Sequence, residues 1–164
     1  MRRMPIMRAA STSAVPMLTL LAGAAHASHY AIADVPRLLT GPQIDKLHKA
    51  SVNTTEELLD KAAKGKDRKA LAKTTGISAT ELLALARRCD VLRIKGVGSE
   101  MVLLLEAAGV RSTVELAKQD APALMAAMSN ANKTAKITEK PPTEPQVADW
   151  IDQAKKLPQV LEAK

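Results

Sequence analysis

The sequence has very few aromatic residues and very little cysteine. Its 164 residues include one Tyr, one Trp and no Phe, which together make up 1% of the chain. Aromatic residues favour strands, so an apolar set of Leu, Ala, Val and Ile favours packed helices over a β-sandwich or barrel. The single Cys excludes a disulfide framework and a multi-cysteine zinc site. At 46% hydrophobic and 25% charged residues, the composition is that of a globular protein.

The first 27 residues have the three parts of a secretory signal peptide. Three arginines and no acidic residue lie before position 9, and an uncharged stretch with an apolar centre runs to residue 25. Ala25-His26-Ala27 then has the pattern of a cleavage site. We expect export, periplasmic or secreted, after cleavage near Ala27–Ser28; the alternative is an N-terminal extension of a cytoplasmic protein. Cleavage would lower the formal net charge from +7 to +4, because residues 1–27 contain three Arg and no acidic residue. We expect no membrane span to remain, since the apolar stretch is shorter than the roughly 20 residues that a spanning helix needs.

Helix starts and ends are clearly marked in the rest of the chain. Four S/T-x-x-E/Q sequences predict capped N-termini, at residues 54–57, 78–81, 112–115 and 143–146. Gly76 and Gly109, each followed by an apolar residue, predict helix ends. Apolar residues recur at helical spacing, and two stripes include Cys89 and Trp150, which we expect to be buried. The polar segment 132–142 ends in two prolines, so we predict a loop there.

An internal repeat occurs at an offset of 58 residues. Residues 50–58 align without a gap to residues 108–116, and their apolar, capping and acidic positions agree. The apolar positions of the helix before each segment match as well, with Ile44 on Val102 and Leu47 on Leu105. The sequence therefore predicts an all-α fold built from a duplicated helical unit.

The functional prediction rests on one short segment, Ile94-Lys95-Gly96-Val97-Gly98-Ser99, between two predicted helices. Two glycines around one apolar residue permit a tight turn between helices, with Val97 filling the space between them. The backbone amides at the start of the following helix are then available to an anion. This segment resembles the helix-hairpin-helix motif of DNA ligases, repair nucleases and competence DNA receptors. The resemblance implies that the loop amides bind a phosphate of duplex DNA without reading its sequence.

A wider resemblance covers residues 35–157. The chain resembles an uncharacterised bacterial family, a helix-hairpin-helix domain of unknown function. The segments that carry the resemblance are Leu-Leu-Thr-Gly-Pro-Gln at 38–43, Asn-Thr-Thr-Glu-Glu-Leu-Leu at 53–59, Arg-Lys-Ala-Leu-Ala-Lys-Thr-Thr-Gly-Ile-Ser at 68–78, Arg-Ile-Lys-Gly-Val-Gly at 93–98, Leu-Leu-Glu-Ala-Ala-Gly-Val at 104–110 and Val-Ala-Asp-Trp-Ile-Asp-Gln-Ala-Lys at 147–155. It implies tandem hairpin units, with halves at about 35–77 and 78–157 and a closing C-terminal helix. A linker at 28–34 and a tail at 158–164 flank this domain.

Two functions follow as expectations. The first is a non-enzymatic module that binds the backbone of DNA or another polyanion through Arg93, Lys95, Gly96, Val97, Gly98 and Ser99. The second is an exported protein-interaction or scaffold module in which the hairpins only pack. Two features favour the second: the first repeat has no paired-glycine turn, and Glu100 would repel a phosphate at the start of its helix.

The remaining sequence offers little for catalysis. It contains no metal-binding, nucleophile or nucleotide-binding motif, so we expect no enzyme activity, no catalytic or metal-ligating residue and no cofactor. The strongest basic stretch is a set of six residues between 61 and 73, namely Lys61, Lys64, Lys66, Arg68, Lys69 and Lys73. A basic stretch of this kind indicates either a polyanion footprint or a solvated helix face.

Overall fold

The computed structural model describes residues 30–162. Over this range the protein is all-α, with eight α-helices, one 3-10 helix and no strand. The 3-10 helix is η1 (Ile32–Asp34), and the α-helices are α1 (Gly41–Lys49), α2 (Thr55–Ala62), α3 (Gly65–Thr75), α4 (Ala79–Val91), α5 (Ser99–Ala107), α6 (Thr113–Leu116), α7 (Ala121–Ala135) and α8 (Glu144–Lys156). The predicted signal peptide lies outside the described residues. No helix within them is long and apolar enough to cross a membrane.

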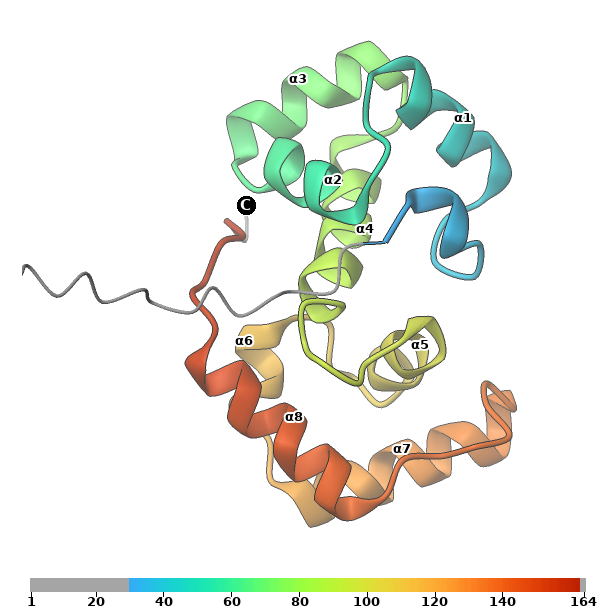
Figure 1. Cartoon of the computed structure of the whole chain (residues 1–164), viewed down its shortest axis with the longest axis vertical. Helices are drawn as coiled ribbons and strands as arrows, with labels where there is room; N and C mark the ends of the chain where they lie inside the picture. Colours follow the sequence, from blue (N-terminus) through green and yellow to red (C-terminus); the bar gives the residue numbers. More distant parts are fainter. Residues whose placement is uncertain (1–29, 163–164) are drawn as a thin grey trace, which may run out of the picture.

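Helix α4 occupies the centre of the molecule. Figure 1 shows α1, α2 and α3 grouped around its N-terminal part and α5 to α8 grouped beyond its C-terminal end. The buried face of α4 follows the helical spacing predicted from sequence, and it includes Leu82, Leu85, Ala86 and Cys89. Because α2 and α3 pack on one part of α4 and its other end leads into α5, one continuous apolar core joins the two groups of helices.

The sequence repeat corresponds to a repeated structure, α1–α2 and α5–α6. In each copy the residue after the turn donates its amide to the helix before it, from Val52 to the Leu47 carbonyl (3.0 Å) and from Val110 to the Leu105 carbonyl (2.8 Å). The turn residues Ser51 and Gly109 both have positive φ, at 54° and 92°. A glutamate in the next helix then accepts a backbone amide in each copy, at 2.6 Å from Asn53 and 2.7 Å from Arg111.

The predicted N-terminal caps form as expected. Thr54 and Thr143 make complete capping boxes, and the hydroxyls of Ser78 and Ser112 accept the amides of Glu81 (3.1 Å) and Glu115 (3.2 Å). A further capping box at Thr40 was not predicted.

The loop predicted at 132–142 is wrong at its start, because α7 continues to Ala135. The Asn132 side chain, near the end of α7, contacts the segment that follows the helix. Its Oδ1 accepts the Thr138 amide (3.0 Å) and its Nδ2 donates to the Thr138 carbonyl (2.9 Å), so Asn132 holds the returning chain from within the helix.

Both flanks of the predicted domain pack onto it. Ile32, in the predicted linker, is fully buried, and its amide donates to the Asn53 carbonyl (2.9 Å). The Tyr30 carbonyl accepts the Thr55 amide (2.9 Å) at the start of α2. In the predicted tail, the Glu162 amide donates to the Ala63 carbonyl (2.9 Å). The chain after α8 therefore returns from the α5–α8 group to the start of α3.

Candidate functional site

The turn between α4 and α5 has the tight geometry that its sequence predicted. After α4 ends, the Val97 amide donates to the Ile94 carbonyl (3.1 Å), and Gly96 has a φ of +88°. Ile94 and Val97 are both buried, with exposed fractions of 0% and 1%. Val97 therefore fills the space between the two helices, and Gly98 is the N-cap residue of α5.

Helix α8 covers one side of this turn. The Gln153 side chain pairs with the Lys95 peptide groups, because its Oε1 accepts the Lys95 amide (2.8 Å) and its Nε2 donates to the Lys95 carbonyl (3.1 Å). The same Nε2 donates to Asp149 Oδ2 (2.8 Å), which orients the amide. A Cβ on Gly96 would lie 3.2 Å from Trp150 Nε1. The turn is thus fitted against α8, and Trp150 is buried as its stripe predicted.

The predicted site residues lie in this one turn, but their side chains do not converge. Arg93 donates to the Asp90 carboxylate (2.7 Å) and to the Pro158 carbonyl (3.2 Å), and its side chain is only 13% exposed. Lys95 and Gly98 are exposed, and Ser99 is half-buried. Of the two cations predicted to assist an anion, only Lys95 therefore projects from the surface.

Glu100, in the first turn of α5, has two partners. Its carboxylate accepts a hydrogen bond from Arg37 Nη1 (2.6 Å) and another from Thr138 Oγ1 (2.7 Å). Arg37 belongs to the segment of the first repeat that corresponds to the glycine turn, and it is about half exposed. The sequence analysis did not single out Arg37. Its charge offsets that of Glu100 beside the α5 N-terminus.

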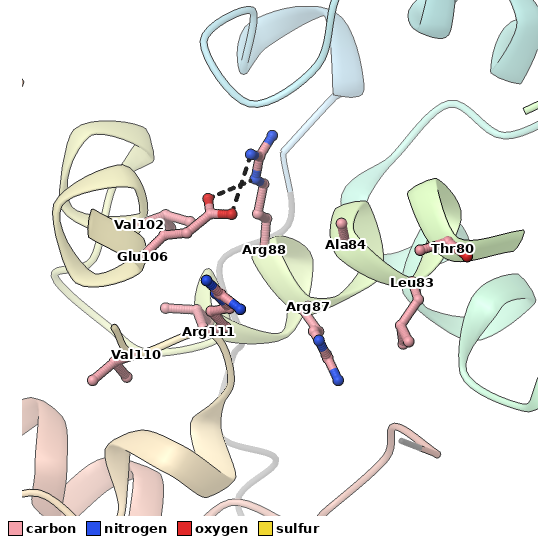
Figure 2. Close-up of a pocket in the computed structure, with 10 residues that line it drawn as sticks. Thr80, Leu83, Ala84, Arg87, Arg88, Val102, Glu106, Val110 and Arg111 are labelled. Atoms are coloured by element: carbon pink, nitrogen blue, oxygen red, sulfur yellow. Dashed lines mark hydrogen bonds and ion pairs between the residues drawn. The ribbon is translucent and has the colours of Figure 1, made fainter. Parts of the chain in front are cut away.

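A second candidate site lies beside the C-terminal half of α4. It is a cavity of about 190 Å³ between α4, α5 and the turn that leads to α6 (Figure 2). Its apolar lining consists of Leu83, Ala84, Val91, Val102 and Val110, and its polar lining of Thr80, Arg87, Arg88, Glu106 and Arg111. The sequence analysis did not identify this cavity, because nothing local connects Arg87 and Arg88 with Arg111.

The three arginines of this cavity differ in their partners. Arg88 donates to both oxygens of Glu106 (2.9 and 3.3 Å) and to the Leu38 carbonyl (2.7 Å). The guanidinium groups of Arg87 and Arg111 have no hydrogen bond or ion pair within residues 30–162. In Figure 2, Arg111 extends from the α5–α6 turn toward α4, while Arg87 and Arg88 leave α4 in different directions.

Cys89 is confirmed as a buried thiol. Burial, followed by the neighbouring Asp90 carboxylate, raises the pKa of the Cys89 thiol to about 12, although the charge of Arg88 acts in the opposite direction. The thiol is therefore un-ionised at neutral pH and is a poor nucleophile. Within the described part of the chain, no three His, Cys, Asp or Glu side chains are arranged to hold a metal ion.

Comparison with known proteins gives a family but no characterised relative. The family described as "Domain of unknown function (DUF4332)" matches residues 40–157, which is most of the chain. A search of the curated proteins found no match, and neither did a search of the solved structures. The matched region begins at the N-cap of α1 and ends just after α8, so it includes the glycine turn, its α8 cover and the arginine-lined cavity. The chain belongs to the DUF4332 family.

Proposed function

We propose that this protein is an exported, non-enzymatic interaction module in which the glycine turn has a packing role. The observation that carries the proposal is the pairing of Gln153 with both peptide groups of Lys95. A turn whose backbone is already hydrogen-bonded to α8, and whose Gly96 lies against Trp150, is adapted to join helices. The ion pair of Arg93 with Asp90 supports the same conclusion, because it removes one of the two predicted phosphate-binding cations.

The second candidate is a module that binds DNA, or another polyanion, through its phosphate backbone. It is favoured by the resemblance of the turn to helix-hairpin-helix motifs, and a distant relationship to that group is part of this proposal. Gly98 and the Lys95 side chain are exposed at the start of α5, where backbone amides favour an anion. Arg37 offsets the charge of Glu100, which would otherwise repel a phosphate.

Binding to duplex DNA at increasing salt concentrations distinguishes the two candidates. Phosphate contacts release counterions, so binding through the turn would weaken steeply with salt. We expect no such binding by the wild-type chain, and no difference between Lys95→Glu and the matched control Lys118→Glu, which places the same charge change at an exposed lysine after α6. Salt-sensitive binding that is lost in Lys95→Glu and retained in Lys118→Glu would contradict the packing role and support the second candidate.

Export is tested separately. When the complete chain is expressed in a bacterium with its N-terminus intact, the exported product is expected to begin at Ser28, because the A-x-A pattern ends at Ala27. N-terminal sequencing of the periplasmic or secreted fraction measures this directly. An intact Met1 on the mature, folded protein in the cytoplasm would contradict it.

A further inference from the structure

The cavity beside α4 is partly apolar and large enough for a small ligand. Five aliphatic side chains line it, and its volume is about 190 Å³. For comparison, a cavity of about 150 Å³ lined by aliphatic and aromatic residues accommodates benzene. The space beside α4 is therefore sufficient for one compact apolar group, such as a phenyl ring or a branched alkyl chain, but not for a long chain.

The charge around this cavity is unbalanced. Its lining includes three arginines and one acidic residue, Glu106, which is paired with Arg88. Two positive charges, those of Arg87 and Arg111, remain without a partner in the described chain. A guanidinium group matches the planar geometry of a carboxylate and can donate two parallel hydrogen bonds to it. The cavity thus combines an apolar interior with unpartnered donors for an anion.

The fold itself does not need Arg111. The first repeat forms the same turn with Asn53 at the corresponding position, and both residues donate only their backbone amide to a glutamate, at 2.6 and 2.7 Å. The turn geometry is therefore independent of the side chain at this position. Arg111 is exposed and its side chain has no partner in the described chain, so its charge is available to a ligand in the cavity.

We propose that this cavity binds a small organic monocarboxylate with a compact apolar body, such as an aromatic or branched-chain acid. The carboxylate would pair with Arg111, which extends toward α4 (Figure 2), and the apolar body would lie among Leu83, Val102 and Val110, with Arg87 adding positive charge to the lining. The lining favours a carboxylate over a phosphate ester, since Thr80 supplies the only side-chain hydroxyl and half of the ten lining residues are aliphatic. A carboxylate ligand would specify what the proposed interaction module binds. This proposal rests on the proposed function only in that both treat the chain as a binding protein.

Benzoate is the first probe, with benzamide as its uncharged isostere and inorganic phosphate as an anion without an apolar body. Each is titrated into the ¹⁵N-labelled full chain while amide chemical shifts are followed. We expect saturable benzoate binding that shifts the amides of residues lining the cavity. Benzamide and phosphate should each bind at least about tenfold more weakly, because each lacks one of the two recognition elements. Equal binding of benzoate and phosphate, or of benzoate and benzamide, would overturn the proposal.

Substitution of the arginines supplies the second test. Arg111→Gln should weaken benzoate binding by about tenfold or more, and Arg87→Gln by less, with the melting temperature unchanged because neither side chain has a partner in the described chain. Lys118→Gln, which removes a charge elsewhere, should bind as the wild type does. Wild-type binding by Arg111→Gln, or no saturable benzoate binding by the wild-type chain, would refute the proposal. These results are independent of the Lys95 experiment with DNA, so the two proposals can fail separately.

Discussion

Gly96 satisfies two constraints that only glycine meets. Its φ is +88°, in a region that side chains disfavour, and a Cβ would lie 3.2 Å from the buried Trp150 indole nitrogen. We predict that Gly96→Ala lowers the free energy of unfolding by about 1–3 kcal/mol. Chemical denaturation followed by circular dichroism measures this loss.

Gly98→Ala is the matched control, because Gly98 has a φ of −98° and no atom within 4 Å of a Cβ position. It should cost less than about 1 kcal/mol, the range for changing an N-cap glycine. Equal losses in the two variants would contradict the packing of the turn against α8. The comparison also separates a local effect on the α5 N-terminus from an effect on the contact with Trp150.

Cys89 makes stability depend on pH in the alkaline range. Burial raises the pKa of its thiol from 9.0 to about 12. The protonated thiol is present in both states below pH 9, so the effect is absent there; between pH 9 and 12 only the unfolded chain ionises, and the folded state loses stability. We predict an added loss of up to about 1.4 kcal/mol per pH unit over that interval.

Urea denaturation at a series of alkaline pH values measures this slope. Cys89→Ala is the control, because it lacks the thiol and retains every other alkaline titration. Its stability should decline less steeply than that of the wild type above pH 9. Parallel curves for the two proteins would show that Cys89 ionises freely in the fold.

The burial of single residues was predictable where it depended on the local spacing of apolar residues. The helical stripes identified Cys89 and Trp150 as buried, and both are. Arg68 was grouped with the basic stretch, yet it is buried. Its Nη1 donates to the Ala62 carbonyl (2.8 Å) and its Nη2 to the carbonyl of Glu162 (3.3 Å), which lies 94 residues away along the chain. The sequence around Arg68 does not indicate a partner so far along the chain.

At the scale of helices, Asp90 joins two elements. Its Oδ2 accepts the hydroxyl (2.6 Å) and amide (3.2 Å) of Thr113 at the start of α6, and its Oδ1 accepts from Arg93 (2.7 Å). The residue is only 2% exposed, so its removal leaves buried donors without partners. We predict that Asp90→Ala lowers the free energy of unfolding by about 3–5 kcal/mol.

Asp152→Ala provides the comparison, because Asp152 also forms an ion pair with a residue three positions away but is largely exposed. That substitution should cost less than about 1 kcal/mol. Thermal or urea unfolding of both variants measures the difference. A similar small loss in the two proteins would mean that Asp90 does not hold α6 against α4.

Helix boundaries were more predictable than the contacts between helices. The S/T-x-x-E/Q sequences place the N-termini of α2, α4, α6 and α8 correctly because a capping hydroxyl and its partner lie within one turn. The pairing of Gln153 with Lys95 was not predicted, since it depends on how α8 crosses the α4–α5 turn. The sequence marked the turn that contains the candidate site, but it gave no sign that α8 lies against this turn.

At the scale of the whole molecule, a duplicated helical unit is closed by a segment outside the repeat. The repeat at an offset of 58 residues predicted α1–α2 and α5–α6, and both copies have the same turn. Helix α8 covers the turn of the second copy, and the following residues run back toward the first group of helices (Figure 1). The arginine-lined cavity also arises at this scale, because its lining comes from α4, α5 and the α5–α6 turn.

The segment after α8 joins the two groups of helices and should contribute to global stability. Glu162 accepts the Gly65 amide on its carboxylate (2.8 Å) and donates its own amide to the Ala63 carbonyl (2.9 Å), while the Pro158 carbonyl accepts from Arg93 (3.2 Å). Each such hydrogen bond contributes about 1 kcal/mol net, and ordering the segment offsets part of that gain. We predict that a chain ending at Leu157 loses about 1–3 kcal/mol, which lowers its melting temperature by roughly 3–10 °C.

Glu162→Gln is a smaller change than this truncation. It retains the backbone hydrogen bond from Glu162 to Ala63 and replaces the carboxylate that accepts the Gly65 amide. Its melting temperature should lie between those of the wild type and the truncated chain. Hydrogen exchange adds a local measurement: the amides of Ala63 to Gly65 should lose protection in the truncated chain, while those at the centre of α4 change only in proportion to the global loss. An unchanged melting temperature together with unchanged exchange at Gly65 would show that residues 158–162 rest on the surface without stabilising the junction.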